Sequence, residues 1–399
     1  RAAASAFCTI DPELRSRVRA RVVRALLDEH IAESDLAGTN GYGYDDAARE
    51  RYESLLARIF GTQAALARLS LVSGTQAIVL TLAACVPPGG KLVSATGAPY
   101  DALRMAIADA ERSLVAQGVR YEEIPLRADG TFDAQALGAT LAREPCDAVF
   151  VQRSRGYHRR PSLSIDDCAQ IAGLVKRVSP RTLVLVDNCY GELVEEREPT
   201  HVGADAVMGS LIKNLGGGLA PTGGYVAGTR AVVDRVADRL YAPGLGAALG
   251  PTLGVGRTFV QGLLYAPLVV DEALRGLNFA SALFERLGFE VDPKPGAPRR
   301  DTIIAIELGN RERLIAFAHG LQKALPVNAR FAPEPGPVPG YAVPVIMSSG
   351  AFVAGATIEL SCDAPLRAPY TMFLQGGILA EHGALGALLA ADAVERQGS

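Results

Sequence analysis

The chain has 399 residues, of which 49% are apolar and 21% charged, and its formal net charge is −3 at pH 7. These values are ordinary for a globular protein, and they argue against nucleic acid or an anionic membrane surface as a partner. The length fits two domains, because a single hydrophobic core stops growing efficiently near about 250–300 residues.

The cysteines and the apolar runs indicate in which cellular compartment the protein lies. No cysteine has the spacing of a zinc site, so we expect no metal and interpret as reduced thiols Cys8, Cys85, Cys146, Cys168, Cys189 and Cys362. No apolar run approaches the roughly 18–20 residues of a membrane span. The first residues lack the basic-then-apolar pattern of a signal peptide. We therefore expect a cytoplasmic protein.

The first sixty residues predict two helices separated by a loop. Apolar residues recur at helical spacing between Asp11 and Glu33, and Pro12 follows Asp11 as it would at a capped helix start. The loop from Gly38 to Asp46 is rich in glycine and tyrosine, which is unusual for a plain connector. A second helix is predicted over 46–60. We interpret residues 1–45 as an N-terminal helix and arm.

From residue 70 onward, short apolar runs alternate with helical stretches. The predicted strands are Leu71-Val72, 91–94, 121–124, 147–152, 182–186, 205–208 and 224–227, and the helices between them are 73–84, 99–115, 134–143 and 164–178. This alternation predicts an α/β fold with a mostly parallel sheet and helices on both faces. The ligand of such a sheet lies beyond the carboxyl ends of its strands.

The remaining third of the chain predicts a smaller α+β domain. Helices are expected over 232–240 and 253–275, and a helix over 278–287 opens the second domain. Its strands are predicted at 302–308, 344–348 and 357–361, with covering helices at 311–324 and 383–394. The predicted organisation is therefore a large domain over 46–275 and a small C-terminal domain over 276–399.

An acid and a lysine follow two neighbouring predicted strands. Asp187 ends one apolar run, and Ser210 and Lys213 follow the next, before three successive glycines. Alone, Asp187 could cap a helix, and a loop lysine is usually solvated. Together they indicate a pyridoxal 5'-phosphate (PLP) site. In such a site the lysine amine holds the cofactor as a Schiff base and the carboxylate pairs with the protonated pyridine nitrogen.

Two earlier segments reach the same edge of the predicted sheet. Ser73-Gly74-Thr75 opens a helix, where backbone N–H groups and the helix dipole favour phosphate, although a plain capped helix start explains it as well. Tyr100 follows the next strand and could stack on a pyridine ring, or simply pack. The order of phosphate turn, aromatic, acid and Ser-x-x-Lys, each after a strand of one sheet, favours the PLP interpretation.

The motifs along the chain resemble a known family. They are Gly41-Tyr-Gly-Tyr44, Gln152-Arg-Ser-Arg-Gly-Tyr157, Val186-Asp-Asn-Cys-Tyr-Gly-Glu192, Ser210-Leu-Ile-Lys-Asn-Leu-Gly-Gly-Gly218, Ala242-Pro-Gly-Leu-Gly246, Val260-Gln-Gly262 and Glu359-Leu-Ser361. With them the chain resembles fold-type I PLP enzymes, and specifically the methionine gamma-lyase-like or aluminum resistance branch of the cystathionine and methionine gamma-lyase superfamily. The resemblance covers almost the whole chain.

The resemblance implies a role for each matching residue. It makes Lys213 the Schiff-base lysine, Asp187 the partner of the pyridine nitrogen, and Tyr100 the stacking ring. It places the cofactor phosphate on Ser73, Gly74, Thr75 and Ser210. In the superfamily a tyrosine of the glycine-rich loop reaches the neighbouring subunit's site, which implies that role for Tyr42 or Tyr44. A homodimer or homotetramer with shared active sites follows.

The sequence departs from the better-known lyases in three places. Ile212 stands where a hydroxyl side chain is common, and Cys189 stands where a threonine is usual. Glu359 replaces the arginine that binds the substrate carboxylate in the superfamily. Another cation must then hold that carboxylate, and the candidate is Arg367, with rivals Arg153, Arg155 and Arg257.

The expected function is that of a PLP-dependent lyase acting on an amino acid, with carbon–sulfur cleavage by beta- or gamma-elimination. One alternative keeps PLP but performs gamma-replacement or an aldol-type cleavage in a specialised biosynthetic pathway. A second alternative is a non-catalytic homologue, which the presence of both Lys213 and Asp187 disfavours. A nucleotide-binding Rossmann domain is disfavoured because no Gly-x-Gly-x-x-Gly follows the first strand.

Overall fold

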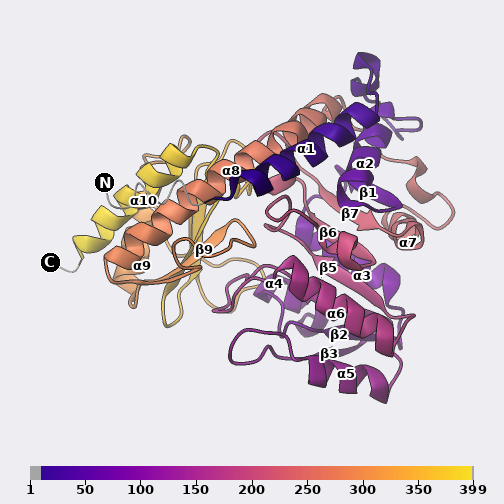
Figure 1. Ribbon diagram of the computed structural model, residues 1–399, viewed down its shortest axis with the longest axis horizontal. Coiled ribbons are helices and arrows are strands. Elements are labelled where there is room, and N and C mark those ends of the chain that lie inside the picture. Colours follow the sequence, from indigo (N-terminus) through magenta and orange to yellow (C-terminus); the bar gives the residue numbers. More distant parts are fainter. Residues whose placement is uncertain (1–9, 398–399) are drawn as a thin grey trace.

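The computed structural model describes residues 10–397, and Cys8 lies outside the described residues. The chain forms a large α/β part and a smaller part built on a second sheet, with one long helix running through both (Figure 1). The predicted α/β fold class is confirmed.

The N-terminal helices begin where their caps predict. The side chain of Asp11 accepts backbone N–H groups at the start of α1 (Pro12–Asp28), and Asp46 accepts the N–H of Arg49 at the start of α2 (Ala47–Phe60). The first helix ends at Asp28, five residues before the predicted end at Glu33. The short 3-10 turn η2 (Glu33–Leu36) follows it. The loop before α2 is tied to a distant segment, because Asp46 also accepts the backbone N–H of Thr252 at 2.8 Å.

The large sheet has seven strands in the order β1-β7-β6-β5-β4-β2-β3. The strands from β6 to β3 are parallel, whereas β7 pairs antiparallel with both β6 and β1. In chain order the strands are β1 (Ala64–Arg68), β2 (Lys91–Ser94), β3 (Arg120–Glu123), β4 (Ala148–Gln152), β5 (Leu183–Asp187), β6 (Ala206–Ser210) and β7 (Gly224–Gly228).

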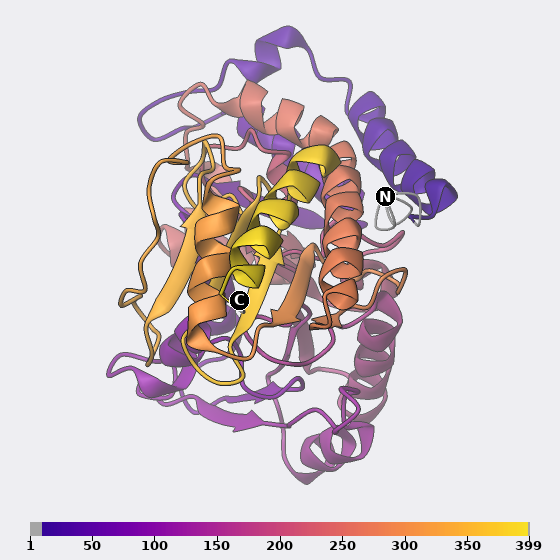
Figure 2. The ribbon, with the colours of Figure 1, turned by 90° about the vertical axis from the view of Figure 1, so that its left-hand side faces the viewer.

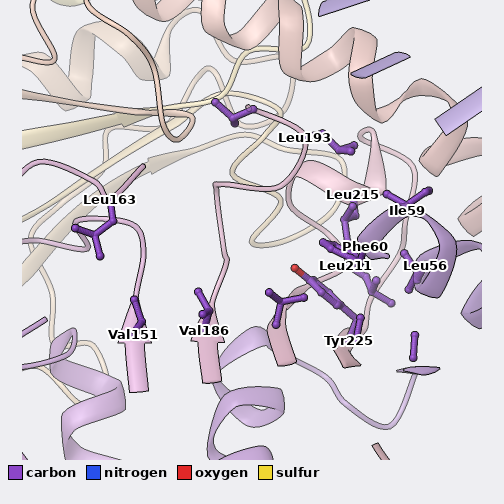
Figure 3. Packing of buried hydrophobic residues seen from close by; sticks show 14 of the residues in the cluster. Leu56, Ile59, Phe60, Val151, Leu163, Val186, Leu193, Leu211, Leu215 and Tyr225 are labelled. Atoms are coloured by element: carbon purple, nitrogen blue, oxygen red, sulfur yellow. The ribbon is translucent and has the colours of Figure 1, made fainter. Parts of the chain in front are cut away.

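Side chains of the central strands alternate between two apolar cores. On β5, Val184 and Val186 face the core under α1, α2, α6 and α8, while Leu185 faces the core under α3 and α7. Figure 3 shows the first of these cores, in which the ring of Tyr225 stacks on Phe60 with 5.3 Å between ring centroids. Burial on both faces fixes the register of the strands and hence the position of their carboxyl ends.

Most helices around the large sheet match the prediction, namely α3 (Gly74–Cys85), α5 (Ala134–Arg143), α6 (Ile165–Val178) and α7 (Arg230–Leu240). The helix predicted over 99–115 is wrong beyond its first turns. Only α4 (Asp101–Arg104) and a π-helical segment, η3 (Met105–Asp109), form there. The hydroxyl of Ser113 donates to the carbonyl of Ala108 and accepts the N–H of Ala116, which replaces helical hydrogen bonds with a turn.

The strand predicted at Leu71-Val72 is also wrong. These residues lie in the turn before α3, and the strand of this region is β1, from Ala64 to Arg68. Three of the five residues of β1 are alanines, which have low β-propensity, so the sequence pattern did not reveal it. The pairing of β1 with β7 compensates, because every residue of β1 is buried.

The two helices predicted over 253–275 and 278–287 are one helix, α8 (Gly256–Arg286), which contains Pro267. The predicted domain boundary at 275 and 276 falls inside this helix and stays a prediction. At its start, α8 packs backbone to backbone on the loop after Lys213, since a Cβ on Gly262 would lie 2.3 Å from the carbonyl oxygen of Gly216. Farther along, α1 lies beside α8 through an ion pair between Arg15 and Asp271 (Figure 1).

The smaller part contains a five-stranded antiparallel sheet in the order β10-β11-β12-β9-β8. Its strands are β8 (Glu290–Asp292), β9 (Ile303–Glu307), β10 (Val345–Ser349), β11 (Ser361–Pro365) and β12 (Thr371–Gln375). One face is covered by the end of α8, α9 (Arg311–Gln322) and α10 (Ala380–Glu395), and Figure 2 shows α9 and α10 in front of this sheet. Short turns η4 (Pro199–Val202), η5 (Asn214–Gly216) and η6 (Gly246–Ala248) complete the described elements.

The strand predicted at 357–361 is wrong, because β11 begins only at Ser361 and the preceding residues form turns. Strands β8 and β12 were not predicted. In β11 the residues facing the core are small, Cys362 and Ala364, so its apolar alternation is weak in the sequence. The position of β11 matters for the candidate active site described below, because this strand contains Asp363, one of the two acids that line it.

Candidate active site

A cavity of about 430 Å³ lies at the carboxyl ends of β4, β5 and β6, between the large sheet and the small one. This is where a parallel sheet places its ligand. The predicted site residues that line it are Ser73, Gly74, Thr75, Tyr100, Asp187, Ser210 and Lys213. The fold therefore brings together residues that lie up to 140 positions apart in the chain, from 73 to 213.

Asp187 and Lys213 come from adjacent strands. Asp187 is the last residue of β5 and pairs with Met208 of β6, while Lys213 follows the end of β6 by three residues. The carboxylate oxygen Oδ1 of Asp187 accepts the backbone N–H of Cys189 at 3.0 Å, which fixes the acid at the strand end. The lysine Nζ lies 3.8 Å from the ring centroid of Tyr190, a cation–π contact.

The electrostatics of this pair reflect burial. Burial raises the pKa of the Asp187 carboxyl above its usual range, against the opposing effect of the Cys189 N–H and of Lys213. Burial alone lowers the pKa of Lys213, but the acidic groups around it, Cys189, Tyr190 and Asp187, outweigh burial and raise it well above its usual value. Each group is thus stable in its charged form only with a partner of opposite charge.

The N-terminus of α3 forms another wall of the cavity. Ser73 caps α3 by accepting the N–H of Gln76 at 3.1 Å, and the first N–H groups of a helix have no acceptor within it. A Cβ on Gly74 would lie 3.0 Å from Cys189 Sγ and 3.2 Å from the backbone nitrogen of Ser210. Only a residue without a side chain lets the helix end approach the two strand ends this closely.

Tyr100 connects this helix end to the central strands. Its hydroxyl lies 2.7 Å from the Thr75 hydroxyl oxygen, and its backbone N–H donates to Oε1 of Gln152 at 2.9 Å. Burial, with the nearby carboxylate of Asp187, raises the pKa of the Tyr100 hydroxyl well above its usual value. The phenol is therefore neutral and held at both ends, as a ring that packs on a planar ligand must be.

These residues fit PLP. The buried Asp187 needs a cationic partner, and a protonated pyridine nitrogen supplies one. The first N–H groups of α3, together with the hydroxyls of Thr75 and Ser210, form a cradle for a phosphate at a helix N-terminus. Lys213 supplies the amine. The pyridine nitrogen, the phosphate and the aldehyde of PLP thus each have a matching group in one cavity.

The wall opposite the strand ends was not predicted. It is built by Tyr157, Tyr341, Asp363 of β11 and Gln375 of β12, and Ile303 of β9 adds an apolar contact. Tyr157 stands in a segment singled out for its family resemblance, but nothing in that segment indicated a site. Asp363 and Gln375 lie inside strands, where alternation could have pointed to the cavity had β11 and β12 been recognised.

Tyr190 was also missed. It has φ of 71°, a left-handed conformation that is strained for a tyrosine, and its ring is the one beneath the lysine amine. In the sequence, the sign that Tyr190 lies near the site is its position between Asp187 and Glu192. Side chains in a left-handed turn point differently from those of a regular strand or helix, so their direction cannot be read from periodicity.

Three predicted site residues do not line the cavity within this chain. Arg367 lies beyond β11, where its guanidinium contacts Asp101 at 3.5 Å and the carbonyl of Tyr157 at 3.4 Å. Tyr157 lines both the cavity and a second hollow of about 320 Å³, and Arg367 lines only the second. Tyr42 and Tyr44 are 76% and 56% exposed. The roles of all three stay predictions.

The rival arginines have other partners. Arg153 is fully buried and binds Asn188 and the carbonyl of Gly191 at 2.7 and 2.8 Å. Arg155 forms an ion pair with Asp292, and Arg257 contacts Glu33 at 3.4 Å on the surface. Among the residues that the structure describes as lining the cavity, none is an arginine.

Glu359, which stands where the superfamily has its carboxylate-binding arginine, faces away from the cavity. Its two carboxylate oxygens accept the backbone N–H groups of Phe352 and Val353, at 2.9 and 3.1 Å. The acid therefore holds the loop that precedes it, and it leaves the cavity wall to Ala354 and Gly355 of that loop.

The fold is that of the fold-type I, PLP-dependent enzymes. The protein YhfS of Escherichia coli, described as pyridoxal-5'-phosphate dependent, shares this fold with a TM-score of 0.61 at 18% identity over 96% of both chains. The apo methionine gamma lyase CalE6 of Micromonospora echinospora shares it with a TM-score of 0.57 at 20% identity, over 88% of this chain and 86% of CalE6.

The family model for methionine gamma-lyase matches residues 2–395, so the chain belongs to the methionine gamma-lyase family. It is 40% identical to the uncharacterized protein YnbB of Bacillus subtilis (strain 168) over 374 residues, 93% of this chain and 89% of YnbB. The crystal structure of a carbon–sulfur lyase involved in aluminum resistance from Clostridium novyi NT aligns with a TM-score of 0.91 at 39% identity, over 95% of this chain and 90% of that one. The recognised resemblance is confirmed.

Two features are absent from residues 10–397. No helix in this range is both long and apolar enough to cross a lipid bilayer. Within the same range, no three His, Cys, Asp or Glu side chains gather in a way that could hold a metal ion. The five cysteines in the described part of the chain are free and buried.

Proposed function

We propose that this protein is a PLP-dependent lyase that cleaves a carbon–sulfur bond of an amino acid by beta- or gamma-elimination. The observation that carries the proposal is the joint placement of Asp187 and Lys213 at adjacent strand ends in one cavity with the N-terminus of α3. Family membership and the carbon–sulfur lyase among the relatives support it.

When bound, PLP supplies an electron sink for the bond broken at the α-carbon of an amino acid. The residues of the chain set this up. Asp187 keeps a proton on the pyridine nitrogen through its carboxylate, and Tyr100 covers the ring. The first N–H groups of α3, with Thr75 and Ser210, hold the phosphate, and Lys213 carries the covalent link to the cofactor.

In the loaded enzyme the Nζ of Lys213 would be the base that takes the proton from the α-carbon of the substrate. The ring of Tyr190 lies 3.8 Å from this nitrogen and would hold it in place. For elimination at the γ-carbon, the same nitrogen would move protons between the α- and β-carbons. The overall reaction would consume one water and yield a thiol, ammonia and a 2-oxo acid.

The exposed Tyr42 and Tyr44 support a shared site. Their rings lie 6.1 Å apart on a loop that is anchored by hydrogen bonds to residues 250–253. We propose that this loop completes the active site of a second subunit in a homodimer or homotetramer. The substrate is a small-molecule amino acid, and the compartment is the cytoplasm.

The direct test is product formation. Purified enzyme with added PLP is incubated with methionine, cystathionine, cysteine or threonine, and 2-oxo acid and thiol are measured. We expect both products from at least one sulfur amino acid and neither from the Lys213→Ala variant. Absence of 2-oxo acid from every sulfur amino acid would reject the lyase proposal. Oxo acid from threonine alone would favour other chemistry on the same cofactor.

The cofactor assignment has its own test. The enzyme with PLP should show a visible absorption band, and reduction with borohydride should fix the cofactor's mass on the peptide that contains Lys213. The matched control is Lys323→Ala, which removes an exposed lysine after α9. A label on another lysine, or a band unchanged in Lys213→Ala, would contradict the assignment. A protein that binds no PLP would be a non-catalytic homologue.

A further inference from the structure

The small sheet presents its second face to the cavity. Because side chains alternate along a strand, Cys362 and Ala364 of β11 face the core under α9 and α10, and Asp363 between them faces the other way. On β12, Phe373 and Gln375 share that second face, and Phe373 pairs with Asp363. Asp363 and Gln375 thus stand side by side in the wall opposite the strand ends.

These two side chains offer hydrogen-bond acceptors without enough donors. The amide Nε2 of Gln375 donates to Oδ1 of Asp363 at 2.9 Å, which fixes the orientation of the amide. Its oxygen Oε1 is then directed elsewhere and has no hydrogen-bond partner among the described residues. Gln375 is 2% exposed, so an unpaired acceptor there is costly unless a ligand supplies a donor.

The charge at this wall also lacks a direct ion pair. The hydrogen-bond partners of Asp363 are the neutral side chains of Gln375 and Tyr157, and among the described residues Lys213 acts on it only as a charge beyond ion-pair distance. Lys213 is the one cation among the described residues that line the cavity, and Asp187 is the second acid. When Lys213 and Asp187 serve the cofactor, the carboxylate of Asp363 is left facing the substrate space. A buried carboxylate is stabilised by a cation.

From this geometry we infer that Asp363 and Gln375 form a subsite for a protonated amine, or a similar multi-donor cationic group, carried by the substrate in addition to its α-amino group. The inference rests on the proposed function only in taking an amino acid as the substrate. It identifies the substrate class as amino acids with a cationic side chain and makes Asp363 a specificity-determining residue. Neutral alkyl side chains leave both acceptors unpaired and bind less tightly.

Calorimetry with unreactive ligands tests the subsite without turnover. L-Ornithine and L-norleucine have side chains of equal length and differ at the tip, which is an ammonium in one and a methyl group in the other. We expect the PLP-loaded enzyme to bind ornithine about tenfold or more tightly than norleucine at pH 8, because only the ammonium group can donate charge-assisted hydrogen bonds to both acceptors. The ratio should fall to about one in Asp363→Asn. The matched control is Asp392→Asn, which neutralises an exposed acid on α10 and should keep the ratio.

The same preference should depend on pH in the unmodified enzyme, which keeps the test valid if Asp363→Asn fails to fold. Burial raises the pKa of Asp363 to about 6, opposed by hydrogen bonds from Tyr157 and Gln375 and by Lys213. Tyr190 and Tyr341, which face it, and the adjacent Cys362, which points to the other face of β11, have raised pKa values and stay neutral below pH 8. The ornithine preference should therefore be full above about pH 7 and decline below pH 6.

Turnover gives an independent measurement. S-(2-Aminoethyl)-L-cysteine and S-propyl-L-cysteine are matched in length, and we expect kcat/KM to favour the aminoethyl compound about tenfold or more. Equal binding of ornithine and norleucine, or a preference that survives in Asp363→Asn, would overturn the subsite. Failure to cleave either cysteine derivative would count against the lyase proposal, whereas the calorimetric ratio would still decide the subsite.

Discussion

The two walls of the cavity are built in different ways. One wall consists of the carboxyl ends of parallel strands and the N-terminus of α3, and it contributes Asp187 and Ser210 from the last strand positions and Lys213 from the loop after β6. The other is the open face of an antiparallel sheet, which contributes Asp363 and Gln375 from within β11 and β12. The first wall carries the groups that we propose for the cofactor, and the second carries those that we propose for the substrate.

This difference teaches where chemistry and specificity reside. Strand-end loops can arrange a lysine, an acid and helix N–H groups around one ligand, because all parallel strands end at the same edge. A strand face offers side chains at fixed spacing and can exchange them without disturbing the loops. Changes to the first wall should therefore lower kcat, and changes to the second should alter KM and substrate preference.

The largest effect is expected from Lys213→Ala. This variant loses both the covalent attachment of PLP and the base that moves the α-proton, so kcat should fall by about 10³-fold or more. Steady-state release of 2-oxo acid measures it. Partial recovery by added methylamine would show that an amine is the missing group. A decrease in kcat of less than tenfold would show that the catalytic groups do not lie in this wall.

A smaller loss in kcat is expected from Asp187→Asn. The amide keeps the shape of the carboxylate but cannot hold a proton on the pyridine nitrogen, so kcat should fall by about 10²-fold. KM should change little, because the substrate does not contact this side chain. The measurement is a kcat and KM determination with PLP in excess. A change confined to KM would contradict the assignment of the cofactor to the first wall and of the substrate to the second.

Arg367→Gln tests the predicted carboxylate contact on the side of the small sheet. Loss of a charge-assisted contact of about 1.5–3 kcal/mol should raise KM about tenfold or more, with kcat nearly unchanged. Arg257→Gln is the matched control, since Arg257 is exposed and contacts only Glu33 among its described ion-pair partners. Equal KM values for the two variants would show that another cation, such as one from a neighbouring subunit, holds the carboxylate.

The smallest expected effect is on the pH dependence of folding stability, through Glu192, which is buried behind the first wall. Glu192 is fully buried, accepts the hydroxyl of Tyr225 at 2.9 Å, and has a pKa that burial raises to about 8. In the unfolded chain a glutamate has a pKa of about 4.3. The folded state thus binds more protons between about pH 4.3 and 8, so the stabilisation that is full below pH 4.3 is lost as pH rises through 8.

Glu192→Gln should remove this dependence, because the amide does not titrate. Between pH 5 and 8 the Tm of the unmodified protein should fall by about 2–4 °C more than that of the variant, measured by differential scanning calorimetry. Equal slopes would mean that the acid is ionised in the folded state. The site would then contain a further negative charge close to the cofactor wall.

The same contrast explains what the sequence could predict. Strong apolar runs end directly at Asp187 and before Ser210 and Lys213, so the parallel strands and the residues beyond them were recognisable. The opposite wall was not, because β11 is built of small and polar residues and was placed four residues early. Asp363 therefore lies outside every predicted strand. Its contact with Gln375 depends on antiparallel pairing between strands that periodicity alone did not reveal.

The continuity of α8 has a mechanical consequence. At about 1.5 Å per residue its 31 residues extend for about 46 Å, and the packing of Gly262 on Gly216 attaches its first part to the loop after the lysine. Its last part packs on the sheet that carries Asp363. One continuous helix thus contacts both walls of the cavity. A displacement of the small sheet along the axis of α8 would therefore also act on the loop that follows the lysine.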